Sequence, residues 1–189
     1  MNGVSSVLAA FGLSASAGLN AYIPLLIVSL MARFTDWVTL SKPWDAMSSW
    51  WVIGALAILT LIEFFADKFP AVNHVNDVVQ SFVRPAAGAV LFAASTGAAT
   101  KIHPVVAIIA GLLVAGSVHA TKALAIRPAV TATTAGAGNV PVSILEDLAA
   151  TVLSILAVIL PVVIAALIIV VTAFIVWWLW RRANTPQPA

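Results

Sequence analysis

Long apolar runs, separated by short polar stretches, dominate the pattern of hydrophobic and polar positions along this chain. Five runs predict helices: Val4–Arg33, Trp50–Lys68, Ala86–Thr100, Pro104–Ile126 and Leu148–Trp180. Most of them approach or exceed the ~20 residues that a helix needs to cross the hydrocarbon core of a bilayer. We therefore expect an all-α fold, namely a polytopic transmembrane helix bundle with about five spans.

Two prolines lie inside the predicted spans. Pro24 removes a hydrogen bond and its ring clashes with the carbonyl of Asn20, so we expect a kink or short unwinding near Asn20. Pro161 divides the last run, which is longer than one bilayer crossing requires. We expect one long, kinked and tilted helix there. Two shorter segments that turn at Pro161 are the alternative, but no Gly or Asn is present to make that turn.

The remaining segments have other polarity patterns. Val72–Val83 places valines at helical spacing on one side and polar residues on the other, which predicts a short amphipathic or re-entrant helix. Pro85 begins the next helix, and Arg127–Val142, rich in Thr, Gly and Ala, is expected to be irregular. Residues 1–182 then form a single transmembrane domain, and residues 183–189 form a disordered polar tail.

Composition supports the membrane interpretation. The 189 residues are 62% hydrophobic and 8% charged, whereas soluble domains carry about a quarter charged residues. The lipid bilayer is therefore the expected solvent for much of the surface. The first apolar run has no Lys or Arg before it, so we interpret it as a retained helix and not as a secretory signal. The absence of cysteine excludes disulfides, thiolate metal sites and cysteine nucleophiles. No basic face or motif indicates a nucleic-acid partner.

Charged residues nevertheless lie within or between the apolar runs, and their signs balance. Residues 50–150 contain five acids and five bases: Glu63, Asp67, Asp77, Glu146 and Asp147, with Lys68, Arg84, Lys101, Lys122 and Arg127. A charge near the bilayer centre costs about 2.5–3.5 kcal/mol even on lenient insertion scales. Such residues are expected to pair with one another or to perform a function.

The acidic residues are the first candidates for chemistry. Glu63 and Asp67 are four residues apart and share one helix face, and Asp77, Glu146 and Asp147 complete the set. A desolvated carboxylate close to a base can load and release a proton or bind a cation. The alternative is structural ion pairing between helices, without transport.

The basic residues form a second candidate group. His119 and Lys122 are one helical turn apart, and together with Arg127 and Arg84 they could hold an anionic group. Arginine is particularly suited to a phosphate or carboxylate. In the alternative interpretation, Lys122 and Arg127 only extend toward the membrane interface from the end of their helix.

Metal binding and catalysis receive less support. His74 and Asp77 are three residues apart and could converge on one ion, but no second histidine is in register, so we expect no metal and no cofactor. Ser14 follows a glycine by two positions and could pair with His119 or His103 as in an intramembrane serine protease. Ser14 lies among small residues that typically pack helices, so an enzymatic function is not expected.

Several short stretches occur in an order that is specific to one family. They are Gly18-Leu19-Asn20-Ala21-Tyr22, Glu63 with Ala66-Asp67-Lys68 and Pro70, Asn76-Asp77, Arg84-Pro85-Ala86-Ala87-Gly88, His119-Ala120-Thr121-Lys122, Arg127, and Ser143 with Glu146-Asp147. In these stretches the chain resembles an uncharacterised bacterial family of integral membrane proteins, domain of unknown function 4126. The resemblance implies a polytopic membrane protein and brings no established activity.

Together these patterns predict a small membrane transporter or channel-like protein, coupled to protons or cations, that acts on a small ion or an anionic solute. The expected site is formed by Asn20, Glu63, Asp67, Asp77, Arg84, His119, Lys122, Arg127, Glu146 and Asp147. Unwound backbone near Asn20 would contribute, because discontinuous helices form the sites of many transporters. The alternative is a non-transporting structural or assembly subunit of a membrane complex.

The expected location is the bacterial cytoplasmic membrane with a cytoplasmic C-terminus. Five crossings place Arg33, Lys42 and Lys101 on the same side as Arg181 and Arg182, against four bases on the other side, Lys68, Arg84, Lys122 and Arg127. The positive-inside rule assigns the first side to the cytoplasm if those four are buried within the protein and are not counted. The Ala- and Gly-rich helix over residues 86–100 could also serve a homo-oligomer.

Overall fold

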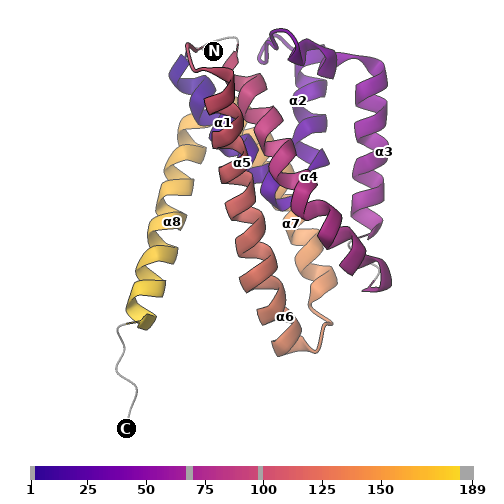
Figure 1. The fold of residues 1–189 in the computed structure, drawn as a ribbon, viewed down its shortest axis with the longest axis vertical. Coiled ribbons are helices and arrows are strands. Elements are labelled where there is room, and N and C mark those ends of the chain that lie inside the picture. Colours follow the sequence, from indigo (N-terminus) through magenta and orange to yellow (C-terminus); the bar gives the residue numbers. More distant parts are fainter. Residues whose placement is uncertain (1–2, 67–69, 98–99, 184–189) are drawn as a thin grey trace.

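The computed structural model describes residues 3–66, 70–97 and 100–183, and these residues form helices without any strand (Figure 1). The α-helices are α1 (Gly3–Leu19), α2 (Tyr22–Phe34), α3 (Trp50–Ala66), α4 (Pro70–Gly97), α5 (Pro104–Thr121), α6 (Arg127–Thr134), α7 (Asn139–Ile159) and α8 (Pro161–Ala183). A 3-10 helix η1 (Trp44–Ser48) lies in the loop before α3, and a π-helix η2 (Lys122–Ile126) joins α5 to α6.

Helix α2 turns back along the bundle after α1, and we call this helix pair the hairpin (Figure 1). In α1, the Ser16 hydroxyl lies 2.8 Å from the carbonyl oxygen of Ala150, in the middle of α7. Beyond α2, Asp36 lies beside Val158, near the end of α7. The chain thus enters the bundle along α1 and returns to the same end along α2. The expected single helix over residues 4–33 is therefore wrong.

The sequence around Asn20 explains the turn of the hairpin. The Asn20 Oδ1 atom accepts hydrogen bonds from the backbone N–H groups of Tyr22 (3.1 Å) and Ile23 (3.0 Å), as a capping residue does at the start of a helix. Pro24 lies in the first turn of α2, where a missing N–H is tolerated. The predicted interruption near Asn20 is confirmed, but Pro24 begins a new helix instead of bending one.

Helix α4 continues through Pro85, so the predicted helix boundary there is wrong. The amphipathic segment expected over residues 72–83 forms the first part of this longer helix. Arg84 and Ala87 are buried, and Gly88 contacts Gly111 of α5. We attribute the continuity of α4 to this packing, which outweighs the loss of one backbone hydrogen bond at the proline.

A single helical segment also extends from Pro104 to Thr134, through η2. The irregular segment expected over residues 127–142 is therefore limited to a short turn between α6 and α7. In that turn, Ala135 has a positive φ of 50° and Gly136 a φ of 88°. The next helix already begins at Asn139.

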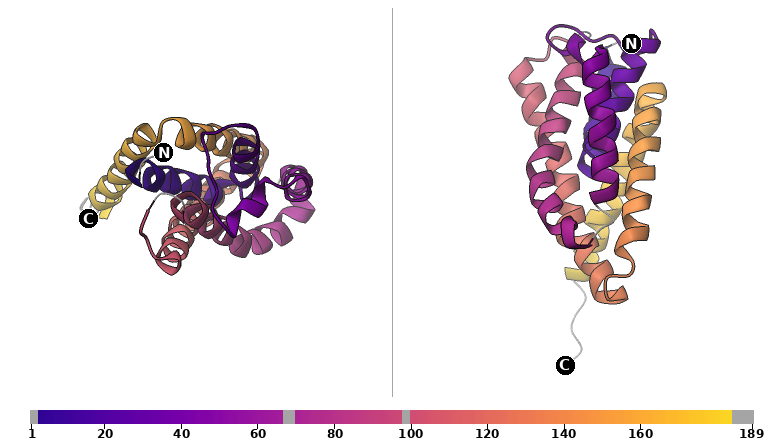
Figure 2. Two further views of the ribbon diagram at one scale, coloured as in Figure 1. Left: turned by 90° about the horizontal axis from the view of Figure 1, so that it is seen from above. Right: turned by 90° about the vertical axis from the view of Figure 1, so that its right-hand side faces the viewer.

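The last apolar run forms two helices, and the expected single helix over residues 148–180 is wrong. Leu160 separates α7 from α8 with φ −131° and ψ 62°, outside the helical region. Proline disfavours helical backbone in the preceding residue, which gives Pro161 its effect here. Helix α8 returns along the bundle in the opposite direction to α7 (Figures 1 and 2).

These reversals change the distribution of charge between the two ends of the bundle. Arg33, in the last turn of α2, lies at the end where the hairpin enters, whereas α8 and Arg181 end at the opposite side (Figure 1). Lys101 follows α4 and also lies at the hairpin's end. The expectation that Arg33, Lys42 and Lys101 share a side with Arg181 and Arg182 is therefore wrong, because the chain turns back at Asn20 and α8 ends at the other end of the bundle.

Close backbone contacts hold the hairpin in the bundle. A Cβ atom on Gly18 of α1 would lie 2.6 Å from the carbonyl oxygen of Ala115 and 2.6 Å from the Cβ of Val118, both on α5. Gly88 of α4 and Gly111 of α5 approach each other equally closely. Small residues allow helices to approach in this way in a membrane-type interior. The tip of the hairpin thus reaches the centre of the bundle.

Three described segments are long and apolar enough to cross a membrane: Val78–Gly97, Pro104–Thr134 and Asn139–Ile159. Shorter apolar helices are formed by Gly3–Leu19, Tyr22–Phe34, Trp50–Ala66 and Leu167–Trp178. Large apolar side chains on the outer faces are exposed, as shown by Trp51 at 91% and Leu124 at 80%. An outer surface of this kind suits contact with lipid.

Candidate functional site

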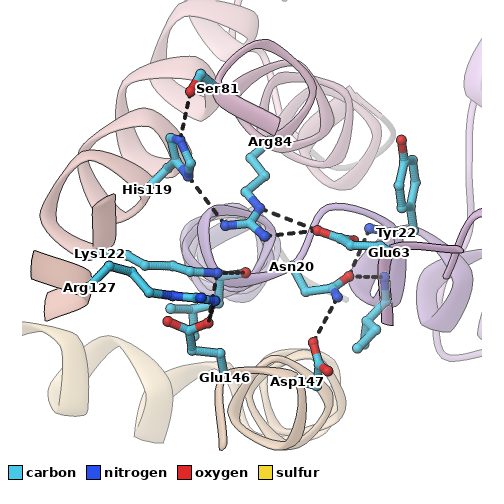
Figure 3. A network of polar contacts seen from close by, with 12 residues as sticks. Asn20, Tyr22, Glu63, Ser81, Arg84, His119, Lys122, Arg127, Glu146 and Asp147 are labelled. Carbon is cyan, nitrogen blue, oxygen red and sulfur yellow. Dashed lines mark hydrogen bonds and ion pairs between the residues drawn. The ribbon is translucent and has the colours of Figure 1, made fainter. Parts of the chain in front are cut away.

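The tip of the hairpin lies in a network of buried polar side chains (Figure 3). Asn20 is fully buried and connects two helices: its Oδ1 caps α2, and its Nδ2 donates a 3.0 Å hydrogen bond to Oδ1 of Asp147 on α7. A side-chain amide suits this position because it offers an acceptor and a donor at once. Asn20 therefore couples the turn of the hairpin to α7.

A lysine from α5–α6 satisfies the backbone at the end of α1. The Lys122 Nζ atom donates a 3.1 Å hydrogen bond to the carbonyl oxygen of Leu19, which the end of the helix leaves without an intrahelical partner. The same ammonium group lies 2.8 Å from Oε2 of Glu146 on α7. The freed carbonyl is thus satisfied inside the protein, as a low-dielectric interior requires.

Arg127 reaches the same carboxylate. Its NH2 atom donates to Oε2 of Glu146 at 2.8 Å, so that two cations share one carboxylate oxygen. Lys122 and Arg127 are five residues apart, which would place them ~140° apart around a regular α-helix. The π-helix η2 prevents this, because the Arg127 N–H donates to the Lys122 carbonyl and brings both residues onto one face.

A second ion pair connects α3 with α4 and α5. Arg84 donates to Oε1 of Glu63 through NH2 at 3.0 Å and Nε at 3.3 Å, and its NH1 lies 3.3 Å from Nδ1 of His119. Because a guanidinium only donates, Nδ1 must accept, and the neutral ring carries its proton on Nε2. That N–H can then donate to the Ser81 hydroxyl, 3.2 Å away.

The charged groups of this network are almost completely removed from solvent. The side chains of Arg84 and Glu63 are 0% and 1% exposed, and those of Lys122, Arg127 and Glu146 do not exceed 10%. Removal of one partner from a buried pair typically costs 3–5 kcal/mol, since it leaves an uncompensated charge. Each pair therefore strongly constrains how its helices can be arranged.

Eight of the ten predicted site residues lie around the hairpin tip (Figure 3). They are Asn20, Glu63, Arg84, His119, Lys122, Arg127, Glu146 and Asp147. Asp67 lies outside the described residues. Asp77 belongs to α4, but its side chain lies outside the described part of the structure.

The other interpretations of the polar residues find less support. The Ser14 hydroxyl donates a 2.9 Å hydrogen bond to the Gly88 carbonyl and so packs α1 against α4, while His119 bonds to Arg84 and Ser81. Among the described residues, no group of three or more potential ligands is arranged to hold a metal ion. His74 and its proposed partner Asp77 have side chains that are not described.

Sequence reasoning missed Ser81 and the Leu19 carbonyl. Ser81 stands three residues before Arg84 and therefore lies on the same helix face, a spacing that could have identified it. Ser81, His119, Lys122 and Arg127 line a cavity of about 220 Å³ together with Val78 and Ala123. The network thus borders an open space between α4 and α5.

These observations define an all-helical protein with candidate membrane spans and a helix hairpin whose tip meets a buried charged network. Residues 7–182 match the family model described as "Domain of unknown function (DUF4126)", and the chain belongs to this family, as its motifs predicted. No curated protein and no solved structure matches the chain.

Proposed function

We propose that this protein is a small membrane transporter or channel-like protein whose intramembrane site is the charged network at the hairpin tip. The observation that carries the proposal is the interrupted backbone at Asn20, buried beside Lys122, Glu146 and Asp147. Broken helices that meet at the centre of a bundle are a recurring form of transporter binding site.

The proposed membrane arrangement has five crossings, formed by α3, α4, the α5–α6 segment, α7 and α8, with the hairpin entering from one side. The observed alternation of helix directions supports this arrangement (Figure 1). Irregular backbone within a membrane is stable only where protein or a water-filled cavity surrounds it. The hairpin tip meets that condition because Asn20 and Lys122 satisfy its polar groups.

In the proposed cycle, the contact of Glu146 with Lys122 and Arg127 is the resting state. An anionic solute that reaches the two cations replaces the carboxylate, and Glu146 returns when the solute leaves. Glu63 is the candidate proton or cation carboxylate, because it is buried against Arg84 at the other side of the tip. Protonation of Glu63 would remove its attraction for Arg84 and so change the contact between α3 and α4.

Flux through proteoliposomes tests the proposal. We expect vesicles that contain the full-length protein to move one of three probes: protons, detected with a pH-sensitive dye, radiolabelled phosphate or rubidium. Glu63→Gln is expected to lower the flux about tenfold or more, since it keeps the side-chain shape but removes the charge. Asp45→Asn, an exposed carboxylate in η1, is the matched control and should leave it unchanged. Equal flux for the wild type and Glu63→Gln would refute the proposed role.

A structural or assembly subunit is the second candidate, and one observation favours it. Arg84 and Glu63 form a direct pair at 3.0 Å with almost no exposure, as expected for a contact that fixes helix positions. Under this alternative, purification would yield a stoichiometric partner, and the isolated chain would move none of the three probes. The two candidates therefore differ in a measurement that does not depend on mutagenesis.

A further inference from the structure

The cavity between α4 and α5 has a specific chemical character. It encloses about 220 Å³ and is lined by Val78 and Ser81 from α4 and by His119, Lys122, Ala123 and Arg127 from α5 to α6. Figure 3 shows His119, Lys122 and Arg127 projecting from one helical segment: His119 points to Ser81 of α4, and the ends of Lys122 and Arg127 point toward Glu146. The cavity therefore brings together polar groups from two helices.

The polar side chains of this lining are hydrogen-bond donors. Lys122 and Arg127 carry positive charge, and the N–H group of His119 faces the Ser81 oxygen, which leaves the Ser81 O–H to donate. The contact from Arg84 NH1 to His119 Nδ1 fixes that assignment, since it leaves the ring proton on Nε2, the atom that faces Ser81. No carboxylate is among the described residues that line the cavity. Such a donor set complements an oxyanion.

The surroundings of the cavity are apolar and exposed. Val78 is 64% exposed, Phe82 is 77% exposed and Leu124, next to Ala123, is 80% exposed. These side chains would contact lipid tails in the proposed membrane arrangement. A charged group could therefore enter from the side of the bundle with an attached hydrocarbon chain, or from water as a free ion.

We propose that this cavity binds a phosphate group, either as free phosphate or as the headgroup of an anionic lipid. The guanidinium of Arg127 and the ammonium of Lys122 are the two side chains best suited to phosphate oxygens. Ser81 adds a neutral O–H donor from α4, and its oxygen faces the Nε2–H group of His119. The binding of phosphate in this cavity does not depend on the proposed transport function. Only the further statement that phosphate is the transported solute rests on that function.

Glu146 competes with the bound phosphate. Its Oε2 atom is held by Lys122 at 2.8 Å and by Arg127 at 2.8 Å, and both of these side chains also line the cavity. A phosphate that contacts the two cations therefore replaces a carboxylate contact. Glu146→Gln removes the competing charge and should tighten phosphate binding. If Glu146 had a purely structural role, the same substitution would weaken phosphate binding or leave it unchanged.

Binding of inorganic phosphate is measured on the purified full-length chain in a phosphate-free maltoside detergent. Unfolding temperature, followed by the fluorescence of the seven tryptophans, is recorded against phosphate concentration, with chloride at equal ionic strength as the reference. A ligand that binds only the folded protein raises the unfolding temperature. We expect a saturable rise with phosphate beyond that with chloride.

Substitutions locate the bound phosphate. Ser81→Ala should weaken binding about tenfold, because a hydrogen bond to a charged group is lost. Ser117→Ala is the matched control, since its hydroxyl bonds to Val114 within α5 and lies outside the cavity. Ala123→Asp should abolish binding by placing a negative charge in the lining. Equal effects of Ser81→Ala and Ser117→Ala, or binding that survives Ala123→Asp, would overturn the proposal.

Asp77 provides a test of charge sign. It stands four residues before Ser81 on α4 and therefore on the same side of that helix. Asp77→Asn should preserve or tighten phosphate binding. A cavity that instead holds a cation would bind rubidium more tightly after Ala123→Asp, and that result would also overturn the proposal.

Two further measurements distinguish the sources of the phosphate. Native mass spectrometry of delipidated protein supplied with phosphatidylglycerol, against diacylglycerol with the same chains, reports headgroup binding. If the protein retains phosphatidylglycerol and Ser81→Ala weakens this retention, the bound phosphate is a lipid headgroup. A saturable response in the detergent titration identifies free phosphate as a ligand. Either result supports the proposal. Phosphate binding without flux would refute only the proposed transport, and flux of another probe without phosphate binding would refute only this inference.

Discussion

The contact between Asn20 and Asp147 allows the role of the hairpin tip to be measured directly. Asn20→Asp keeps the oxygen that caps α2 through the N–H groups of Tyr22 and Ile23. It removes the Nδ2 donor that lies 3.0 Å from Oδ1 of Asp147 and places a second carboxylate there. The substitution therefore separates the capping role of Asn20 from its role as a donor to α7.

The expected cost follows from these contacts. Loss of a hydrogen bond to a charged group contributes about 1.5–3 kcal/mol, and repulsion between two buried carboxylates adds to it. Asn20→Ala removes the cap as well, which costs a further ~1 kcal/mol, while it avoids the repulsion. We therefore expect both single variants to lower the free energy of unfolding by at least about 2 kcal/mol.

An exchange of the two side chains restores the contact. In the double variant Asn20→Asp with Asp147→Asn, the donor lies on α7 and the acceptor on the hairpin, and one carboxylate remains. Stability should return to within about 1 kcal/mol of the wild type, so that the coupling energy reaches the 0.5–3 kcal/mol typical of contacting residues. Unfolding by denaturing detergent, followed by tryptophan fluorescence, provides the measurement.

This comparison of single and double variants has a matched control and an outcome that would refute the contact between Asn20 and Asp147. Asn139, at the start of α7, bonds to Thr131 at the surface, so Asn139→Asp should change stability by less than about 1 kcal/mol. Additive losses in the double variant would show that Asn20 and Asp147 do not interact as described. The buried turn would then have to be stabilised by other contacts.

Two more predictions test the fold. The chain lacks cysteine, so Val4→Cys and Trp37→Cys can be labelled with an impermeant thiol reagent in sealed vesicles; both should react from one side, and Thr133→Cys from the other. Reaction of the first two from opposite sides would contradict the hairpin. Gly18→Ala should lower the free energy of unfolding by about 1–3 kcal/mol, because its Cβ would meet Ala115 and Val118. Gly54→Ala, with no atom within 4 Å, should instead raise it by up to ~1 kcal/mol, and a loss similar to that of Gly18→Ala would refute the packing argument.

The sequence predicted the interruption at Asn20 but not the direction of the chain beyond it. A proline in an apolar run gives the same signal whether it bends a helix or begins a new one. The outcome depends on the Asn20 cap and on the close contact of Gly18 with α5, both of which require the tertiary structure. The apolar pattern therefore locates helix ends and leaves the number of crossings open.

Two other prolines also show that the sequence alone does not determine whether a proline interrupts a helix. Pro85 and Pro161 both follow residues that could continue a helix, yet only at Pro161 is the helix interrupted. Arg84, before Pro85, is completely buried in contacts with Glu63 and His119, whereas Leu160 is 46% exposed. Packing keeps the backbone of Arg84 helical. Leu160 lacks such packing and adopts the non-helical backbone that is preferred before a proline.

The charged residues were more predictable because desolvation is costly wherever they stand. Arg84, Lys122 and Arg127 had to find acceptors inside an apolar bundle, and the structure provides Glu63 and Glu146. Which acid serves which base could not be predicted. Glu146 serves two cations because η2 changes the helix geometry, and no simple sequence pattern indicates a π-helix.

The π-helix gives this part of the chain one more residue than a regular helix would need. Lys122 and Arg127 lie ~140° apart at five α-helical steps, but ~40° apart at four. Deletion of one residue from 123–125 would therefore leave both cations pointing toward Glu146 and the helix beyond in nearly the same phase. The same deletion between Val105 and Val118 would rotate every later side chain by ~100°. This stretch is thus the point at which the helix can lose a residue without losing register.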